Sequence, residues 1–105
     1  MADFTIEIHK GAARDLDSAP RDTRERIVNK LRDMVTDEWR DLTDYDVKKL
    51  GGTRNDIYRT RIGDWRIVFA VDENEATIVI VGGDKRSGVY RNTDQFDDRA
   101  DDYVG

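Results

Sequence analysis

The segment Tyr58-Arg59-Thr60-Arg61-Ile62-Gly63-Asp64-Trp65-Arg66-Ile67-Val68-Phe69 decides how this chain folds. Gly63-Asp64 between two runs rich in apolar and β-branched residues predicts two strands joined by a two-residue turn. Such a turn places Ile62 opposite Trp65, and Arg61 opposite Arg66. Residues two apart in a strand share a face of the sheet. We therefore expect Arg59, Arg61 and Arg66 on one face.

Arginines that face each other need an explanation, because like charges directly opposite destabilise a strand pair. One interpretation is a solvated sheet face on which each arginine is paired with a nearby aspartate. The alternative is an anion site, and guanidinium groups suit phosphate because they bind it through two parallel hydrogen bonds. A one-residue slip in register would move all three arginines to the other face.

Periodicity predicts the remaining elements. Alternating apolar residues indicate strands at 4–8, 57–62, 65–71 and 76–81. Helical spacing indicates a short helix near residues 12–16 and a longer one over 21–38, with Pro20 between them. Residues 40–56 are expected to form a loop, with a turn of helix around Asp44–Lys48. The order β-α-α-β-β-β predicts an α+β domain, in which a mainly antiparallel four-stranded sheet packs against an N-terminal helical hairpin.

Composition limits the class of protein. The chain has 105 residues, which is enough for one domain, and it has no cysteine and one histidine. Disulfide scaffolds and cysteine-based zinc sites are therefore excluded, and we expect no bound metal. No apolar run approaches the roughly 20 residues that a membrane span needs. The charged N-terminus is unlike a signal peptide, so we expect a cytoplasmic protein with no membrane partner.

The charge is unevenly distributed. The formal net charge is −5, and 18 of the 23 acidic residues are aspartate, which is typical of a salt-adapted protein. An acidic surface argues against non-specific binding of nucleic acid. Residues 92–105 carry five acids and one base, and we expect them to form a flexible acidic tail behind a domain at 1–91. His9 is expected to be an ordinary surface residue.

A second basic cluster, Lys85-Arg86-Ser87-Gly88-Val89-Tyr90-Arg91, follows the last predicted strand. In an antiparallel meander this segment returns beside Arg66, which would bring Lys85 and Arg86 close to it. Tyr90 could stack on a base or take part in proton transfer. The alternative is a surface turn with Tyr90 packed on the edge of the core.

Taken in order, these features resemble the RelE/ParE superfamily of toxins from toxin–antitoxin systems. The resemblance spans residues 3–91. Its closing segment is similar to the family pattern His-Arg-x-x-Val-Tyr-Arg, with Lys85 in place of the histidine. The other segments that carry it are Phe4–Ile8, Ala12-Ala13-Arg14-Asp15-Leu16 followed by Pro20, Lys48-Lys49-Leu50-Gly51, and above all 58–69.

The resemblance implies a microbial RNase fold and a metal-independent, cofactor-free endoribonuclease that cuts mRNA in the ribosomal A site by 2′-hydroxyl attack. It implies that Arg61 and Arg66 stabilise the phosphate, Arg86 assists the leaving oxygen, and Tyr90 stacks on the base. A lysine side chain normally has too high a pKa to act as a general base near neutrality, so with Lys85 in place of the histidine the proton acceptor stays open. The residues implied to hold the RNA backbone are Lys48, Lys49, Arg59, Lys85 and Arg91.

Three functions remain open from the sequence. The first is this ribosome-dependent endoribonuclease, with ribosome and mRNA as partners. The second is a ParE-type toxin, which shares the fold but inhibits DNA gyrase. The third is a non-catalytic binding or regulatory module. Both toxin classes imply a cognate antitoxin, which we expect in the apolar grooves beside the helical hairpin.

Overall fold

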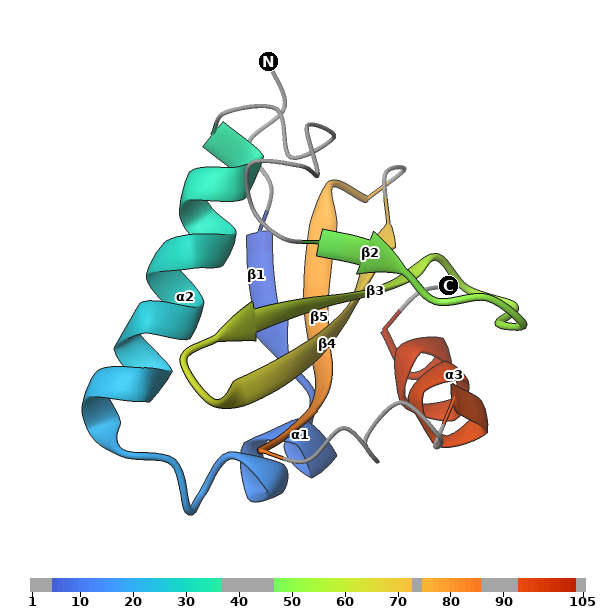
Figure 1. Cartoon of the computed structure of the whole chain (residues 1–105). Coiled ribbons are helices and arrows are strands. Elements are labelled where there is room, and N and C mark those ends of the chain that lie inside the picture. Colours follow the sequence, from blue (N-terminus) through green and yellow to red (C-terminus); the bar gives the residue numbers. More distant parts are fainter. Residues whose placement is uncertain (1–4, 37–46, 73–74, 86–92, 104–105) are drawn as a thin grey trace.

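The computed structural model describes residues 5–36, 47–72, 75–85 and 93–103 (Figure 1). None of the helices in these ranges is long and apolar enough to cross a membrane. The elements are β1 (Thr5–Ile8), α1 (Lys10–Asp15), α2 (Arg21–Thr36), β2 (Val47–Lys49), β3 (Ile57–Ile62), β4 (Trp65–Asp72), β5 (Thr77–Asp84) and α3 (Thr93–Asp101).

The strands form one mixed sheet in the order β1-β5-β4-β3-β2. β1 pairs with β5 in parallel, and the other three pairings are antiparallel. The predicted α+β class and mainly antiparallel sheet are confirmed, but the sheet has five strands rather than four. The additional strand is β2, in part of the segment expected to be a loop with a turn of helix. Three residues are too few to show a period, and residues 40–46 lie outside the described ranges.

The predicted register of the central hairpin is confirmed. Ile62 pairs with Trp65, Arg61 with Arg66 and Arg59 with Val68. Gly63 has a φ of 58°, which is the left-handed conformation that glycine adopts without steric penalty. A glycine in this first turn position matches the twist of the two strands, so the turn itself holds the register.

The N-terminal helices cover one face of the sheet, as predicted. Figure 1 shows α2 running along the sheet and the short α1 lying across the end where β5 finishes. Both helices contribute to one core cluster with the apolar side chains of that face. Its helical members are Ala12, Leu16, Ala19, Ile27 and Leu31, and its strand members are Val47, Ile62, Trp65, Ile67, Phe69, Val71, Ile78 and Ile80.

The C-terminal segment is not the flexible tail that we expected. Thr93–Asp101 forms α3, which covers the second face of the sheet (Figure 1). Phe96 and Ala100 are buried in a second core cluster with Val68, Ala70, Val79 and Val81 of the sheet. A Cβ on Gly82 would collide with the Phe96 ring, so this glycine makes room for the helix. Two apolar residues one helical turn apart, within a run of acids, gave too weak a signal in the sequence.

The acids of α3 bind the segment before β3. The Asp97 carboxylate accepts hydrogen bonds from the backbone N–H groups of Arg54 and Asn55, both at 3.0 Å. The guanidinium of Arg54 also lies 2.7 Å from the Asp101 carboxylate. Several acids of residues 92–105 therefore form contacts within the fold. The acidic charge of this segment was not a sufficient basis for predicting a solvated tail.

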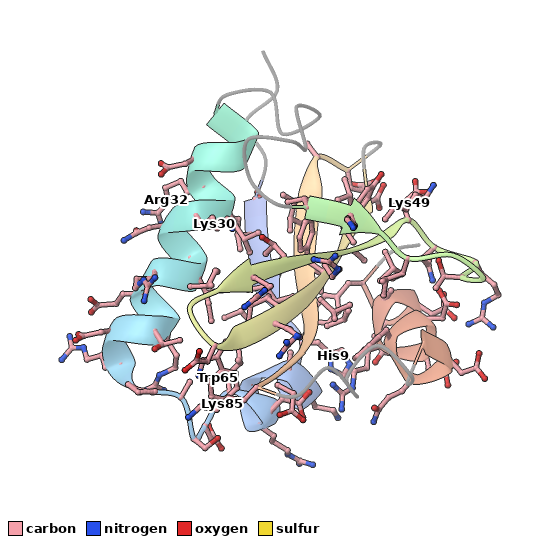
Figure 2. The ribbon with its side chains drawn as sticks, viewed as in Figure 1. His9, Lys30, Arg32, Lys49, Trp65 and Lys85 are labelled. Atoms are coloured by element: carbon pink, nitrogen blue, oxygen red, sulfur yellow. The ribbon has the colours of Figure 1, made fainter. Side chains whose placement is uncertain are left out.

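His9 is buried, contrary to the expectation of a surface residue (Figure 2). Its Nδ1 accepts a hydrogen bond from the backbone N–H of Gly11 and thereby caps α1. The Nε2 therefore carries the ring proton of the neutral imidazole and donates to the Asp102 carboxylate at 2.7 Å. Beside it, Arg99 binds the Asp15 carboxylate at 2.9 Å and the Val81 carbonyl at 2.8 Å. These contacts join α3 to both α1 and β5.

Phe96→Ala should lower the free energy of unfolding by about 3–5 kcal/mol, because it removes a fully buried ring between α3 and the sheet. Gln95→Ala changes the neighbouring exposed position and should stay within about 0.5 kcal/mol. Urea unfolding followed by circular dichroism measures both variants. Equal effects of the two changes would mean that α3 is not part of the cooperative fold.

Asp97 should make stability depend on pH in the acidic range. Its burial opposes ionisation, but the N–H groups of Asn55 and Arg54 outweigh burial and lower its pKa below the ordinary 3.8. The ionised carboxylate therefore stabilises the fold above pH 3.8, and this contribution is lost as the pH falls through the lowered pKa. Asp97→Asn should unfold more easily than wild type at pH 7, and the difference in free energy of unfolding should narrow as the pH falls below 3.8 and through the lowered pKa. A difference that does not narrow as the pH falls would contradict this assignment.

Candidate functional site

Four cations project from the face of the sheet that α3 partly covers. Arg59, Arg61 and Arg66 share this face with the buried Val68, as the hairpin register requires. The pairing of β2 with β3 adds Lys48, which lies opposite Arg59. Lys48 and Arg61 are exposed, and Arg59 and Arg66 are half-buried. We call these four residues the basic face.

Arg61 and Arg66 are directly opposite each other on neighbouring strands. Within the described ranges, no carboxylate forms an ion pair with either side chain. The Arg66 guanidinium donates instead to the backbone carbonyl of Lys85 at 2.6 Å, which holds it toward β5. One interpretation of the sequence paired each arginine with a nearby aspartate on a solvated face. Among the described residues, Arg61 and Arg66 have no such partner.

A bulge in β5 changes what lies beside Arg66. Val68 pairs with Gly82, whereas Phe69 pairs with Ile80, so Val81 is an extra residue in its strand. The bulge reverses the alternation after Val81. It places Asp84 opposite Arg66, on the basic face. Asp84 is thus a candidate site residue that sequence reasoning missed, because an uninterrupted strand would have turned it to the other face.

The same reversal separates Lys85 from the basic face. Its backbone lies beside Arg66, as predicted, but its ammonium lies over the Trp65 ring, 5.9 Å from the centroid (Figure 2). Trp65 belongs to the core cluster on the helix-covered side. Lys85 and Arg66 therefore present their charges on opposite faces of the sheet.

Lys49 is also directed away from the basic face. It is opposite Tyr58, whose ring packs against the helix-covered core, and Figure 2 shows it far from Trp65 and Lys85. Its ammonium lies 3.0 Å from the Asp56 carboxylate. The hydrogen bond to Asp56 raises the pKa of Lys49 above the ordinary 10.5, so this lysine is charged but locally neutralised.

The remaining candidates, Arg86, Tyr90 and Arg91, lie outside the described residues. By register, the described part therefore supplies four cations and one carboxylate, Asp84, on the same face of the sheet. No group of three or more His, Cys, Asp or Glu that could hold a metal ion occurs among the described residues. His9 is engaged by Gly11 and Asp102, so its ring nitrogens serve the fold. The arrangement can bind and stabilise a phosphate anion.

Removing one arginine of the facing pair should stabilise the fold. Arg61→Gln should raise the free energy of unfolding by about 0.2–1 kcal/mol at low salt, because like charges opposite each other destabilise a strand pair. In 1 M NaCl, where the Debye length is about 3 Å, the gain should shrink. Arg21→Gln is the control, since Arg21 pairs with Glu25 at 3.2 Å and its loss cannot stabilise in this way. Denaturation at the two salt concentrations measures both variants, and a gain that does not depend on salt would contradict charge repulsion.

Comparison with known proteins places this chain in a family. The sequence pattern of the family described as Phage derived protein Gp49-like (DUF891) matches residues 14–100. The chain is also similar to a protein named as toxin RelE1 from Methanocaldococcus jannaschii. The two are 29% identical over 89 residues, which cover 85% of this chain and 97% of that protein.

Two solved complexes have the same fold. A chain in the crystal structure of the archaeal RelE-RelB complex from Pyrococcus horikoshii OT3 is 31% identical, with a TM-score of 0.65, over 82% of this chain and 98% of that one. A chain of the RelB-RelE antitoxin-toxin complex from Methanococcus jannaschii is 27% identical, with a TM-score of 0.61, over 81% and 95%. The chain therefore belongs to the Gp49-like family of RelE-like toxins.

Proposed function

We propose that this protein is a metal-independent endoribonuclease that cleaves mRNA in the ribosomal A site, in the cytoplasm, and is neutralised by a cognate antitoxin. The observation that carries the proposal is the facing pair Arg61 and Arg66, held on one sheet face with no ion-paired carboxylate among the described residues. An arrangement that lowers the stability of a hairpin is expected where it serves function.

The reaction requires charge stabilisation more than covalent chemistry by the protein. The 2′-hydroxyl oxygen bonds to the adjacent phosphorus, and the bond from phosphorus to the 5′-oxygen breaks. The products are a 2′,3′-cyclic phosphate and a free 5′-hydroxyl. Arg61 and Arg66 would stabilise the extra negative charge on the pentacoordinate phosphorus, because preorganised cations act strongly where charge develops. Arg59 and Lys48, in the neighbouring row of the basic face, would hold the flanking backbone.

Three further residues enter the proposal through the family resemblance. Arg86 would stabilise the negative charge on the leaving 5′-oxygen, which takes its proton from solvent. Tyr90 would stack on a base, and Arg91 would contact the backbone. Within the described ranges, Asp84 is the carboxylate that the register places beside Arg66. Its carboxylate would accept the proton of the 2′-hydroxyl, a role that arginine cannot take because its guanidinium stays protonated in proteins. Lys49 and Lys85, which point away from the basic face, are not needed for this step.

The antitoxin is the second part of the proposal, and the RelE-RelB complexes from two archaea support it. β1 lies at an edge of the sheet, and the exposed Ile8 borders an apolar cavity of about 160 Å³. An extended antitoxin segment could pair with this edge and insert an apolar side chain into the cavity. The apolar residues of the cavity are Ile8, Ala13, Leu16, Ile27, Val28 and Ile80.

Induced expression tests the nuclease. Wild type should arrest growth and produce cuts at A-site codons of a translated message, detected by primer extension. Arg66→Ala should reduce cutting by about 10²-fold or more, the usual effect of losing one transition-state donor. Asp84→Asn should reduce cutting while RNA binding is retained, and Tyr90→Phe tests the phenol. Arg14→Ala, an exposed change on α1, should cut like wild type.

The alternatives give different results in the same experiment. Growth arrest without cuts would favour a gyrase-inhibiting toxin of the ParE type. Neither arrest nor cuts, in a host whose salt lets the chain fold, would favour a non-catalytic binding module. Cuts that persist unchanged in Arg66→Ala would remove the facing arginines from the mechanism.

A further inference from the structure

A second cationic site lies on the other side of the β3–β4 hairpin from the basic face. Here a cavity of about 240 Å³ opens between the first turns of α2 and the Gly63-Asp64 turn. The turn end of the hairpin is fastened to α2, because the Lys30 ammonium donates to the Arg61 carbonyl at 2.8 Å. The cavity therefore has two walls held at a fixed spacing. It is lined by Pro20, Thr23, Arg26, Ile62, Trp65 and Lys85, together with the two turn residues.

Two cations line this cavity from different elements. Lys85 enters from the end of β5 with its ammonium over the Trp65 ring, as the two labels in Figure 2 show. Arg26 enters from α2, and its Nη1 lies 3.6 Å from where a Cβ on Gly63 would be. Both side chains are exposed, and no carboxylate of the described residues forms an ion pair with either of them. Their charges are therefore available to a ligand.

The other lining groups limit what the ligand can be. The Thr23 hydroxyl can donate a hydrogen bond, and Trp65, Ile62 and Pro20 provide an apolar floor. Asp64 is the acid that the cavity includes, so the titratable lining carries a formal charge of +1. An anion with several acceptor oxygens and an attached apolar portion satisfies these groups. A phosphodiester with its attached nucleoside has this chemistry, because the face of a base can pack on the apolar floor, whereas a peptide carboxylate has fewer acceptors.

We propose that this cavity is a second phosphate site, which binds an RNA phosphodiester away from the scissile one. The proposal rests on the proposed RNA-cleaving function, since RNA is then the polyanion that reaches this surface. The two cation groups lie on opposite faces of one hairpin, so RNA that passes around the Gly63-Asp64 turn can contact both. The phosphodiester can belong to the message or to ribosomal RNA, and the chemistry of the site is the same for both.

Binding measurements on the full chain test the site and distinguish the two sources. The first probe is a 2′-O-methyl message oligonucleotide, which cannot be cleaved because the attacking hydroxyl is blocked. The second is purified ribosomes without message. The test variant is Arg26→Ala with Lys85→Ala, and the matched control is Arg14→Ala with Arg21→Ala. The control removes two exposed arginines elsewhere, and circular dichroism verifies that both double variants fold.

The test variant should bind at least one probe about tenfold more weakly than the control at 0.1 M salt. For the single-stranded probe, the slope of log K against log salt should fall by about 0.7–1.4, as expected for one or two lost phosphate contacts. Asp64→Asn should bind two- to threefold more tightly than wild type, because it removes the negative charge at the rim. Damage to the fold cannot produce such a gain.

Each outcome decides between the sources or against the site. Weakened binding of the oligonucleotide assigns the site to the message, and weakened binding of ribosomes alone assigns it to ribosomal RNA. Equal binding by the test variant and the control on both probes would overturn the site, even if wild type cleaves messages normally. A wild type that binds through Arg26 and Lys85 but never cleaves would overturn the nuclease and leave the site standing.

Discussion

The rest of the structure depends on the register of one hairpin, in which Arg61 faces Arg66 across a two-residue turn. Gly63 adopts the left-handed conformation that this turn requires, and the turn then decides which side chains meet. Trp65, Ile67 and Phe69 are thereby directed to the core beneath α1 and α2, and the arginines to the opposite face. Because strand side chains alternate, a register that buries these apolar side chains also places the arginines together on the opposite face. The hydrophobic core and the repulsion between two guanidinium groups thus come from the same geometry.

Net charge is a poor guide to what this surface binds. The chain is acidic overall, yet the acids of the C-terminal segment are engaged by Arg54, Asn55 and His9, and Arg99 engages Asp15 of α1. Arg61 and Arg66 have no ion-paired acid among the described residues, and neither have Arg26 and Lys85. Attraction of a polyanion at short range depends on this local arrangement, since charges farther away than about 8–10 Å are screened at physiological salt. An acidic toxin can therefore hold cationic sites of limited extent.

Local patterns in the sequence predicted the parts of the fold that are themselves local. The hairpin, the long helix and the arginine face follow from turn chemistry and periodicity. β2 could not be predicted, because three residues become a strand only through pairing with β3. α3 is held by the packing of Phe96 against Gly82, and the buried His9 is held by its hydrogen bond to Asp102. Both features depend on contacts between segments far apart in the sequence, which local patterns do not show. The bulge at Val81 places Asp84 on the basic face and Lys85 on the other, and no residue pattern in that valine- and glycine-rich strand marked its position.

The parallel pairing of β1 with β5 has a consequence for how the toxin is made. Thr5 finds its partner at Thr77, and His9 finds Asp102 93 residues later in the chain. Contacts between residues so far apart are formed slowly, since a long loop must close first. β1 therefore leaves the ribosome before β5 and waits without this neighbour until residues 77–84 have been synthesised. During that interval the edge of β1 and the apolar surface near Ile8 are open to another chain. A partner produced alongside the toxin could thus bind before the toxin has completed its sheet.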